Sequence, residues 1–502
     1  MLTAVVDPHA IETADAGAAT PEGLKLSIGS EERSLRAAVV FTAATSLQRA
    51  IMFLLLPIFT HVLDPAAYGQ LSIALAIYSV AVILFAVGLD VPILRTYVAL
   101  ADEPRRQQHF VRSIWTLLLV APLAIAVVLI IPSYALLDDQ AFVTPLQMVL
   151  TLFGAALYVA ATTVPLAVLR AERRLRAYIL VNVTAAVSTS ALTVAIVAGA
   201  DGGVSGWLVA VAVANLLTLL VALRVLAFRP PSGGLDREAV FESLGFSIPL
   251  LPHTLAQWAL QLADRLALSA IVAVSAVGIY GLASNLAIPL MVIVLSLNHA
   301  LQPRFAAAGK DAALIASMPD LIRVQVALVA VLTLAFALLA GPAINLIVAD
   351  SYAGALDLTP WIVLGYGFLG LYCVPMNLAA LTVGTTKRIW LIAPTAAVVN
   401  LGLIFLLVPD DGLIAAAIAS AAGYAVLLLG AYAYAEFNGN PAPYPWGTIL
   451  SVTLVSFASF MLGTDLIGDA SIGDAAMRLL WLLASGASVL ALAGPRRLKS
   501  LW

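Results

Sequence analysis

The sequence predicts an all-α protein that crosses a membrane about fourteen times. Of its 502 residues, 62% are hydrophobic and only 11% are charged, and the mean hydropathy is +1.03. A water-soluble domain cannot hide that much apolar surface. Apolar stretches of about 20 residues, the length that spans a bilayer, recur between short polar or Gly- and Pro-bearing breaks. Helices are expected throughout, because lipid offers no partner to an open strand edge.

Cutting the chain at these breaks gives fourteen expected spans. The first six are Leu35–Val62, Gly69–Arg95, Phe110–Leu136, Pro145–Leu169, Ala177–Ala200 and Ser205–Phe228. The next six are Phe246–Val274, Val277–Gln302, Leu321–Val348, Leu358–Val383, Ile389–Val408 and Gly412–Tyr434. The last two are Trp446–Ile467 and Ala475–Ala493.

Charged residues alternate in sign between successive breaks. One set of loops is basic and holds Arg33, Arg36, Arg105, Arg106, Arg112, Arg170, Arg173, Arg174, Arg176, Arg229, Arg237, Arg304, Lys310, Lys387, Arg388, Arg496, Arg497 and Lys499. The other set is acidic and holds Asp64, Asp138, Asp139, Asp201, Asp350, Asp410, Asp411 and Asp469, with Arg478 as the basic exception. Because basic loops stay in the cytoplasm, both termini are predicted to be cytoplasmic.

Short matches in register indicate that spans 1–6 and 7–12 are a duplication. Tyr68-Gly69 recurs as Tyr280-Gly281 and Arg176-Ala-Tyr178 as Arg388-Ile-Trp390, both 212 residues later, and Gly202 matches Gly412 after 210. An even number of spans makes the copies parallel repeats, a layout that places a transport site between two lobes. The expected organisation is a disordered cytoplasmic tail (1–34), an N-lobe (35–228), a cytoplasmic linker (229–245), a C-lobe (246–435), helices 13 and 14 (446–493) and a basic cytoplasmic tail (494–502).

The seventh span carries polar residues along one face. His253, Gln257 and Gln261 are four residues apart, and Asp264 and Arg265 follow within the next turn. Asp264 and Arg265 are consecutive, so their side chains are expected to splay by about 100° and to be poor partners for each other. A charge in the middle of a membrane span is costly and usually marks a transport pathway.

The first span offers a second central cation, Arg49, beside Gln48. Two guanidinium groups facing one cavity would favour a diphosphate, whose oxygens they bind in a bidentate way. The predicted cavity residues are therefore Gln48, Arg49, Gln257, Gln261, Asp264 and Arg265. The alternative is that Arg49 and Asp264 form a structural ion pair that never meets a substrate.

Other polar residues carry weaker predictions. Asp90 and Arg95, near the cytoplasmic end of the second span, are interpreted as a cytoplasmic gate or an interfacial pair. His253 and His299 are expected to be satisfied polar residues, because no ligands stand at metal-binding spacing, and no metal is expected. Four asparagines could serve either as bonds between helices or as sugar contacts: Asn285, Asn298, Asn377 and Asn400.

Several classes of function are disfavoured. The single cysteine, Cys373, excludes a disulfide framework and a cysteine metal cluster. No cofactor is expected, because phosphate-loop, dinucleotide and haem motifs are lacking. A membrane glycosyltransferase or polymerase would need catalytic acids on longer outer loops, and a channel would not need two lobes with off-axis charges. A transporter that works by alternating access, and not an enzyme, is the prediction.

The stretch Leu47–Val98 resembles the start of Wzx-type polysaccharide exporters, which are oligosaccharide-lipid flippases of the MOP superfamily. That superfamily also holds the lipid II flippases and the MATE drug exporters. The resemblance rests on a bilobed six-plus-six bundle, a Pro-x-x-Tyr-Gly step into the second helix and a Gly-Leu near its end. Here these are Pro65, Tyr68, Gly69, Gly88 and Leu89. Fourteen helices match the lipid II and exopolysaccharide branches better than the twelve-helix drug exporters.

The resemblance implies a polyprenyl-diphosphate-linked oligosaccharide, moved from the cytoplasmic to the outer leaflet of a bacterial inner membrane for surface polysaccharide biosynthesis, whether lipopolysaccharide or exopolysaccharide. The expected partners are this substrate, membrane lipid and, as candidates, a polysaccharide polymerase and glycosyltransferases; no nucleic acid is expected. Helices 13 and 14 would flank a groove for the polyprenyl tail, or else only pad the bundle or mediate self-association. A cation-coupled multidrug exporter of the same fold is the alternative.

Overall fold

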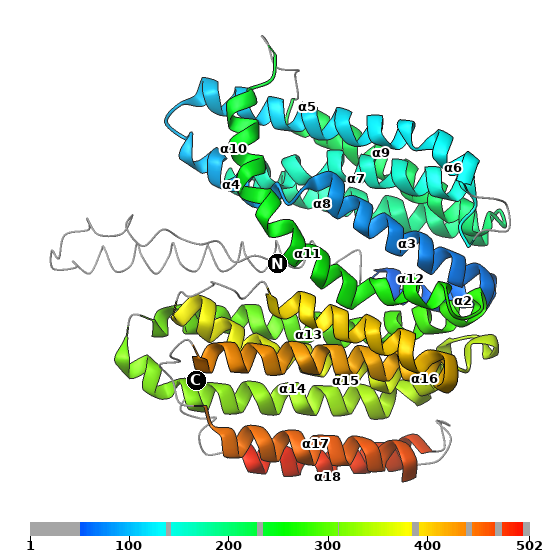
Figure 1. Ribbon diagram of the computed structural model, residues 1–502, viewed down its shortest axis with the longest axis vertical. Coiled ribbons are helices and arrows are strands. Elements are labelled where there is room, and N and C mark those ends of the chain that lie inside the picture. The colour runs from blue at the N-terminus through cyan, green and yellow to red at the C-terminus, as the bar shows by residue number, and fades with distance from the viewer. Residues whose placement is uncertain are drawn as a thin grey trace. The chain divides into compact units, whose positions relative to one another are not determined.

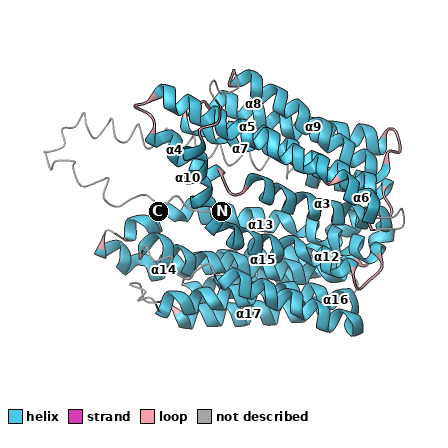
Figure 2. Cartoon of the chain, turned by 45° about the horizontal axis from the view of Figure 1, so that its top comes forward, coloured by secondary structure: helices cyan, strands magenta, loops and turns pink. Residues whose placement is uncertain are grey.

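The computed structural model describes residues 51–136, 142–227, 234–309, 311–383, 391–437, 444–466 and 474–494. Within these ranges all regular elements are helices, which confirms the predicted fold class (Figure 2). Eleven of these helices are long and apolar enough to cross a membrane. The protein is therefore a multi-pass membrane protein.

The eleven helices account for twelve of the fourteen expected spans. One of them, α16 (Ile392–Phe437), runs through the eleventh and twelfth spans and kinks at Gly412, whose φ is +69°. The first span lies mostly outside the described residues, and its end forms α2 (Leu56–Val62). The seventh span is broken into short pieces, which are described with the functional site.

The described residues form two compact units. The N-terminal unit contains 51–54 and Ile77–Thr254, and the C-terminal unit contains Leu55–Ala76 and the chain from Leu255 onward. The division cuts through the second span, so the first half of α3 (Pro65–Ala86) packs with residues that follow it by some two hundred positions. The lobes expected from the sequence place Leu55–Ala76 in the N-lobe, whereas in the structure this segment packs with the C-terminal unit.

The N-terminal unit is a bundle around one central helix, α7 (Pro145–Ala171). A run of small residues on α7 (Ala155, Ala156, Ala160 and Ala161) is fully buried and lets neighbouring backbones come close. The remaining helices of this unit are α4 (Asp90–Ala99), α5 (Pro104–Val128), α6 (Ile130–Leu136), α8 (Leu175–Thr193) with the π-helical η2 (Val194–Ala198), α9 (Gly203–Val225) and α10 (Arg237–Ser247).

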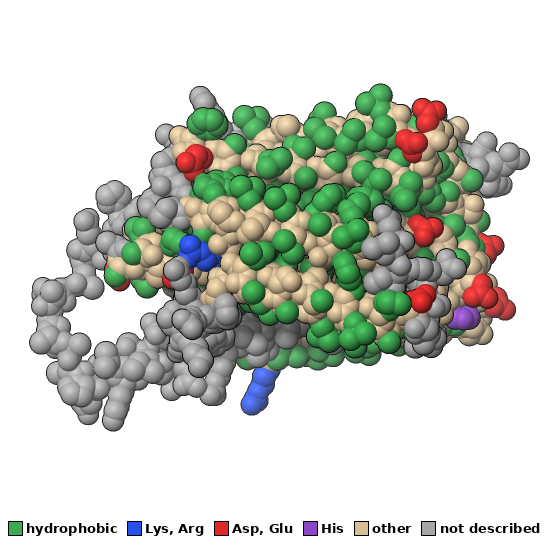
Figure 3. Space-filling model, turned by 90° about the horizontal axis from the view of Figure 1, so that it is seen from below, with side chains coloured by type: hydrophobic (Ala, Val, Ile, Leu, Met, Phe, Trp, Pro, Cys, Tyr) green, Lys and Arg blue, Asp and Glu red, His purple; other side chains and the backbone are tan. Residues whose placement is uncertain are grey.

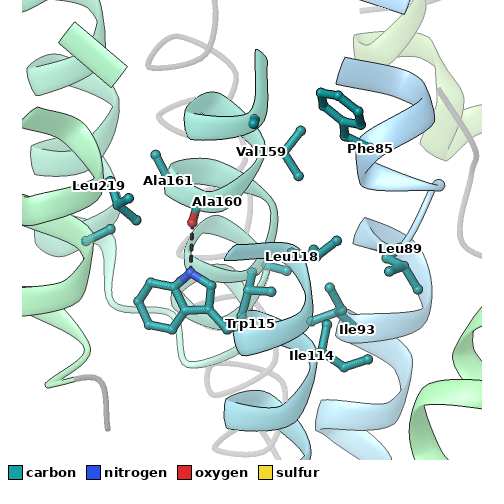
Figure 4. Close-up of a cluster of buried hydrophobic side chains, with 14 of the residues drawn as sticks. Phe85, Leu89, Ile93, Ile114, Trp115, Leu118, Val159, Ala160, Ala161 and Leu219 are labelled. Atoms are coloured by element: carbon teal, nitrogen blue, oxygen red, sulfur yellow. Dashed lines mark hydrogen bonds between the residues drawn. The ribbon is translucent and has the colours of Figure 1, made fainter. Parts of the chain in front are cut away.

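Polar side chains join the helices of this unit inside the apolar core. Trp115 of α5 is 1% exposed, and its indole Nε1 donates to the Ala160 carbonyl of α7 over 2.8 Å (Figure 4). Asn215 of α9 donates to the Gly154 carbonyl at 3.0 Å and to the Tyr78 hydroxyl at 3.1 Å. In a membrane, where apolar contact alone gives little preference between helix and lipid, such bonds fix which helices pair.

The second span is not continuous. Val87 and Gly88 both have positive φ, +49° and +65°, and they separate α3 from α4. Gly88 adopts a positive φ with little steric strain because it has no Cβ. The Ser247 hydroxyl donates to the Gly88 carbonyl at 3.2 Å, so the end of α10 supports the break.

The expected linker 229–245 contains part of a helix, α10. Asp236 caps it by accepting a bond from the Ala239 N–H at 3.1 Å, and the Asp236 N–H donates to Ser113 Oγ at 2.9 Å. Its inner face buries Ala239, Val240 and Ser243. Within the linker that the Pro- and Gly-bearing sequence predicts, the capping Asp and an apolar face form this helix.

The C-terminal unit surrounds α15 (Ala355–Asn377), which packs against α13 (Val274–Ala308), α14 (Ala312–Ile347) and α16. Next to them, α17 (Trp446–Leu466) and α18 (Ala475–Ala493) lie together against α14, as Figure 1 shows. The further elements are the π-helical η4 (Ala259–Ala263), α12 (Asp264–Ser269), η5 (Asp350–Tyr352) and the π-helical η6 (Leu378–Thr382).

Candidate functional site

The seventh span is broken near two prolines and again where the charges stand. It begins after α10 as a 3₁₀ turn, η3 (Ile248–Leu250), and continues as α11 (Leu251–Trp258); Pro249 and Pro252 lie in these two elements. A π-helical turn, η4, follows and leads directly into Asp264, the first residue of α12. π-turns in helices occur frequently at functional sites because they displace the regular carbonyl pattern.

Asp264 is 3% exposed and accepts hydrogen bonds at both carboxylate oxygens. Its Oδ1 accepts the backbone N–H of Arg265 at 2.8 Å, and its Oδ2 accepts the Tyr280 hydroxyl at 2.6 Å. The Tyr280 hydroxyl is also 2.8 Å from Ser420 Oγ, to which Asn400 Nδ2 donates at 3.4 Å. The carboxylate is therefore the end of a polar chain that joins α12, α13 and α16.

Arg265 is 5% exposed and turns its guanidinium back along the helix. Its Nη1 donates to the Gln261 carbonyl, four residues earlier, at 3.0 Å, and lies 3.5 Å from Asp264 Oδ1. The expectation that Asp264 and Arg265 are poor partners is wrong. Because helical side chains lean toward the N-terminus, the long arginine side chain passes beside the carboxylate of the residue before it.

This geometry satisfies two buried charges at once. Removing a charge from water costs several kcal/mol per ion, and an ion pair offsets that cost only with further hydrogen bonds. Asp264 has them from Tyr280 and a backbone N–H, so it does not depend on the guanidinium alone. Both contacts of Arg265 described above use Nη1, which leaves its other donors for a different partner.

The other predicted cavity residues are placed as follows. Gln257 and Gln261 are partly buried on the same broken span, and Gln261 reaches Arg265 through its backbone carbonyl. Gln48 and Arg49 lie outside the described residues, so a pair between Arg49 and Asp264 remains a prediction.

The expected gate residues are not joined to each other. Asp90 and Arg95 are both exposed, and they stand five positions apart on α4, which points them to different sides of the helix. Arg95 instead lies over the ring of Phe246, 5.4 Å from its centroid. Their role as a cytoplasmic gate remains a prediction.

The four asparagines noted in the sequence all make bonds between helices or helix halves. Asn377 of α15 donates to Asn298 Oδ1 of α13 at 2.6 Å, and Asn285 donates to the Tyr68 hydroxyl at 2.8 Å. Asn400 reaches Ser420 across the kink of α16. Tyr280 and Ser420 were not predicted as partners of Asp264; the only signal in the sequence was the recurrence of the Tyr-Gly pair, which does not reveal the direction of the hydroxyl.

An apolar groove, partly open to the surroundings, lies between α14, α15 and α17 of the same unit. Its walls are mostly aliphatic and aromatic, and three hydroxyl-bearing residues, Thr333, Thr453 and Ser456, interrupt them. The groove is therefore suited to a hydrocarbon chain.

Comparison with known proteins assigns a family. The profile described as "polysaccharide biosynthesis protein" matches residues 34–308. Among curated proteins, none matches the sequence. The fold is similar to that of the lipid II flippase MurJ in an inward closed conformation, with a TM-score of 0.71 and 12% identity over 92% of this chain and 100% of that one.

Drug transporters share the fold as well. An inward-facing multidrug resistance MATE transporter of the MOP superfamily aligns with a TM-score of 0.60 and 15% identity, over 82% of this chain and 96% of its own. A eukaryotic MATE transporter aligns with a TM-score of 0.58 and 14% identity, over 81% and 97% of the two chains. At such identities the likeness establishes the fold alone.

Proposed function

We propose, because this chain belongs to the polysaccharide biosynthesis protein family, that it is a flippase for a polyprenyl-diphosphate-linked oligosaccharide. It would carry the substrate from the cytoplasmic to the outer leaflet of a bacterial inner membrane by alternating access. The observation that carries this proposal is the buried pair Asp264–Arg265 on a broken membrane helix. The fold is shared with a lipid II flippase.

Arg265 would bind the diphosphate. Its guanidinium fork matches phosphate oxygens, and the pairing is strongest where water is excluded. Asp264 keeps two donors, the Tyr280 hydroxyl and the Arg265 N–H, when the guanidinium leaves it. The site can therefore alternate between an internal pair when empty and a phosphate-bound arginine when loaded. Arg49 would join Arg265 on the substrate, as the sequence predicts.

The groove between α14, α15 and α17 would hold part of the polyprenyl tail. A hydrocarbon chain gains by burying apolar surface, and the groove walls offer aliphatic and aromatic side chains. The headgroup and the tail would then be held by the same C-terminal unit.

The distribution of charge supports the proposed orientation. On the face drawn in Figure 3, most Asp and Glu side chains gather at the right-hand end and Lys and Arg side chains lie at the left. With the basic end in the cytoplasm, both termini would be cytoplasmic, as the sequence predicts. Glycosyltransferases that build the lipid-linked sugar and a polymerase that consumes it outside are the reaction classes that would precede and follow transport.

Reconstitution tests the proposal against the drug-exporter alternative. Purified protein is placed in liposomes with a fluorescent polyprenyl-diphosphate oligosaccharide, and the fraction of sugar accessible to an external glycosidase is followed. A flippase makes inner-leaflet sugar accessible, and it does not accumulate an organic cation such as ethidium. Cation uptake driven by a proton or sodium gradient, without movement of the lipid-linked sugar, would favour the exporter.

A further inference from the structure

The first turns of α3 and α13 lie against each other along two matched stripes of residues, both within the C-terminal unit. In each stripe the residues stand at positions i, i+4 and i+7, so they share one helix face. The stripe on α3 is Pro65, Gly69 and Ser72, and the stripe on α13 is Val274, Gly278 and Gly281. Pro65 faces Gly278, Gly69 faces both Val274 and Gly278, and Ser72 faces Gly281.

Glycine is required at two of these positions. A Cβ on Gly69 would overlap the Val274 carbonyl oxygen, and a Cβ on Gly278 would overlap the Pro65 carbonyl oxygen. Backbone atoms cannot turn aside as a flexible side chain can. Close approach of two membrane helices depends on such small residues. The two helices can therefore touch at these points only while both glycines are kept.

Two hydrogen bonds fasten the same contact. The Tyr352 hydroxyl donates to the Leu63 carbonyl at 2.7 Å, and Asn285 donates to the Tyr68 hydroxyl at 2.8 Å. The rings of Tyr68 and Tyr352 meet edge to face, 5.8 Å apart. Burial raises the pKa of Tyr352 far above its usual value, so this hydroxyl keeps its proton and remains a donor at physiological pH.

The contact also lies beside the charge pair. A Cβ on Gly281 would meet the Ser72 hydroxyl on one side and Arg265 Nε, at 3.8 Å, on the other. The residue before Gly281 is Tyr280, the donor to Asp264. One turn of α13 therefore lies beside both the charge pair and α3, and Ser72 of α3 is only 5% exposed.

We propose that the start of α3, Pro65–Ser72, is a latch that closes over Arg265 at the acidic end of the bundle and must leave α13 before the substrate can be released there. The inference rests on the proposed function of Arg265. α3 is suited to this role because it continues past Ala76 into the N-terminal unit. A displacement of that unit would thus pull directly on the latch.

The test measures how often Ser72 is uncovered, without any substrate. Cys373 is replaced by Ser, Ser72→Cys is introduced, and the rate of reaction with a polar maleimide is measured on purified protein in detergent. Gly278→Ala is then added, with Gly402→Ala as the matched control, because a Cβ at Gly402 meets nothing within 4 Å. The expected result is a rise in rate of about tenfold for Gly278→Ala, as for a minor open state of a few per cent becoming the main one, and no change for Gly402→Ala.

A milder variant decides the matter if Gly278→Ala does not fold. Tyr352→Phe removes only the bond to the Leu63 carbonyl and should raise the labelling rate several-fold. Equal labelling rates in the folded Gly278→Ala, Tyr352→Phe and control proteins would overturn the latch. Because labelling involves no substrate, a raised rate together with failure to move the lipid-linked sugar would leave the latch standing and remove the proposed function.

Discussion

The hydroxyl of Tyr280 donates to Asp264 Oδ2 over 2.6 Å and lies 2.8 Å from Ser420 Oγ, so one tyrosine of α13 links the broken seventh span to α16. This makes a buried carboxylate part of the packing of three helices. It also allows the Arg265 guanidinium to exchange Asp264 for another anion, because the carboxylate still accepts the Tyr280 hydroxyl and a backbone N–H. Structure and proposed transport therefore depend on the same few atoms.

Tyr280→Phe should destabilise the protein by about 1.5–3 kcal/mol, the usual worth of a hydrogen bond to a charged group. Tyr424→Phe is the matched control, because the buried Tyr424 hydroxyl makes no hydrogen bond within the described part of the chain. Denaturant unfolding in detergent measures both. A loss for Tyr280→Phe no larger than that for Tyr424→Phe would contradict the assigned bond.

The charge pair should show strong coupling. Asp264→Leu leaves a buried guanidinium without its carboxylate and should cost about 3–5 kcal/mol. Adding Arg265→Leu should restore most of that stability, because both buried charges are then gone, while transport stays abolished. Thermal melting of the single and double variants checks this. If the two substitutions are simply additive, the charges are not partners.

The break in the second span should depend on glycine. Gly88→Ala places a Cβ on a residue with φ of +65° and should lower the free energy of unfolding by about 1–2 kcal/mol through backbone strain. A steric clash adds nothing to this loss, because the atom nearest to the new Cβ would be 3.9 Å away. Gly447→Ala, in a helix and with nothing near its Cβ, should be neutral or slightly stabilising. The melting temperatures of the two variants test this prediction. An unchanged melting temperature for Gly88→Ala would mean that the break does not require glycine.

The groove should select for long lipid tails. Thr453→Phe fills part of its wall, whereas Leu454→Phe changes a side chain on the same helix that is 67% exposed. The first variant should slow transport of a long-chain substrate more than that of a short-chain analogue, and the second should affect neither. An equal effect of Thr453→Phe on both substrates would remove the tail from this groove.

Much of the fold could be predicted from the sequence because lipid imposes a simple rule. Apolar length and Gly or Pro breaks give the helices, and twelve expected spans appear as long helices in the described residues. Breaks within spans were harder to predict. Val87 adopts a positive φ that its sequence does not favour, and only the support of Ser247 on Gly88 explains the position of the turn.

The candidate site could be predicted in its charges but not in its pairing. Asp264 and Arg265 stand out because ionisable residues are rare in membrane spans. Their contact depends on how far the Arg265 side chain leans back toward Gln261, and sequence spacing does not report this. Likewise, Tyr280 and Ser420 approach Asp264 only through the packing of helices distant in sequence.

The most direct test of the central claim is transport of the lipid-linked sugar by Arg265 variants in liposomes. Arg265→Lys keeps the charge but loses the bidentate fork, and it should transport at a reduced rate. Arg265→Gln should lower transport by about tenfold or more, as expected for loss of a charged donor worth about 1.5–3 kcal/mol. If both variants are folded and transport at the unmodified rate, Arg265 does not bind the substrate and the charge pair serves only to hold the helices together.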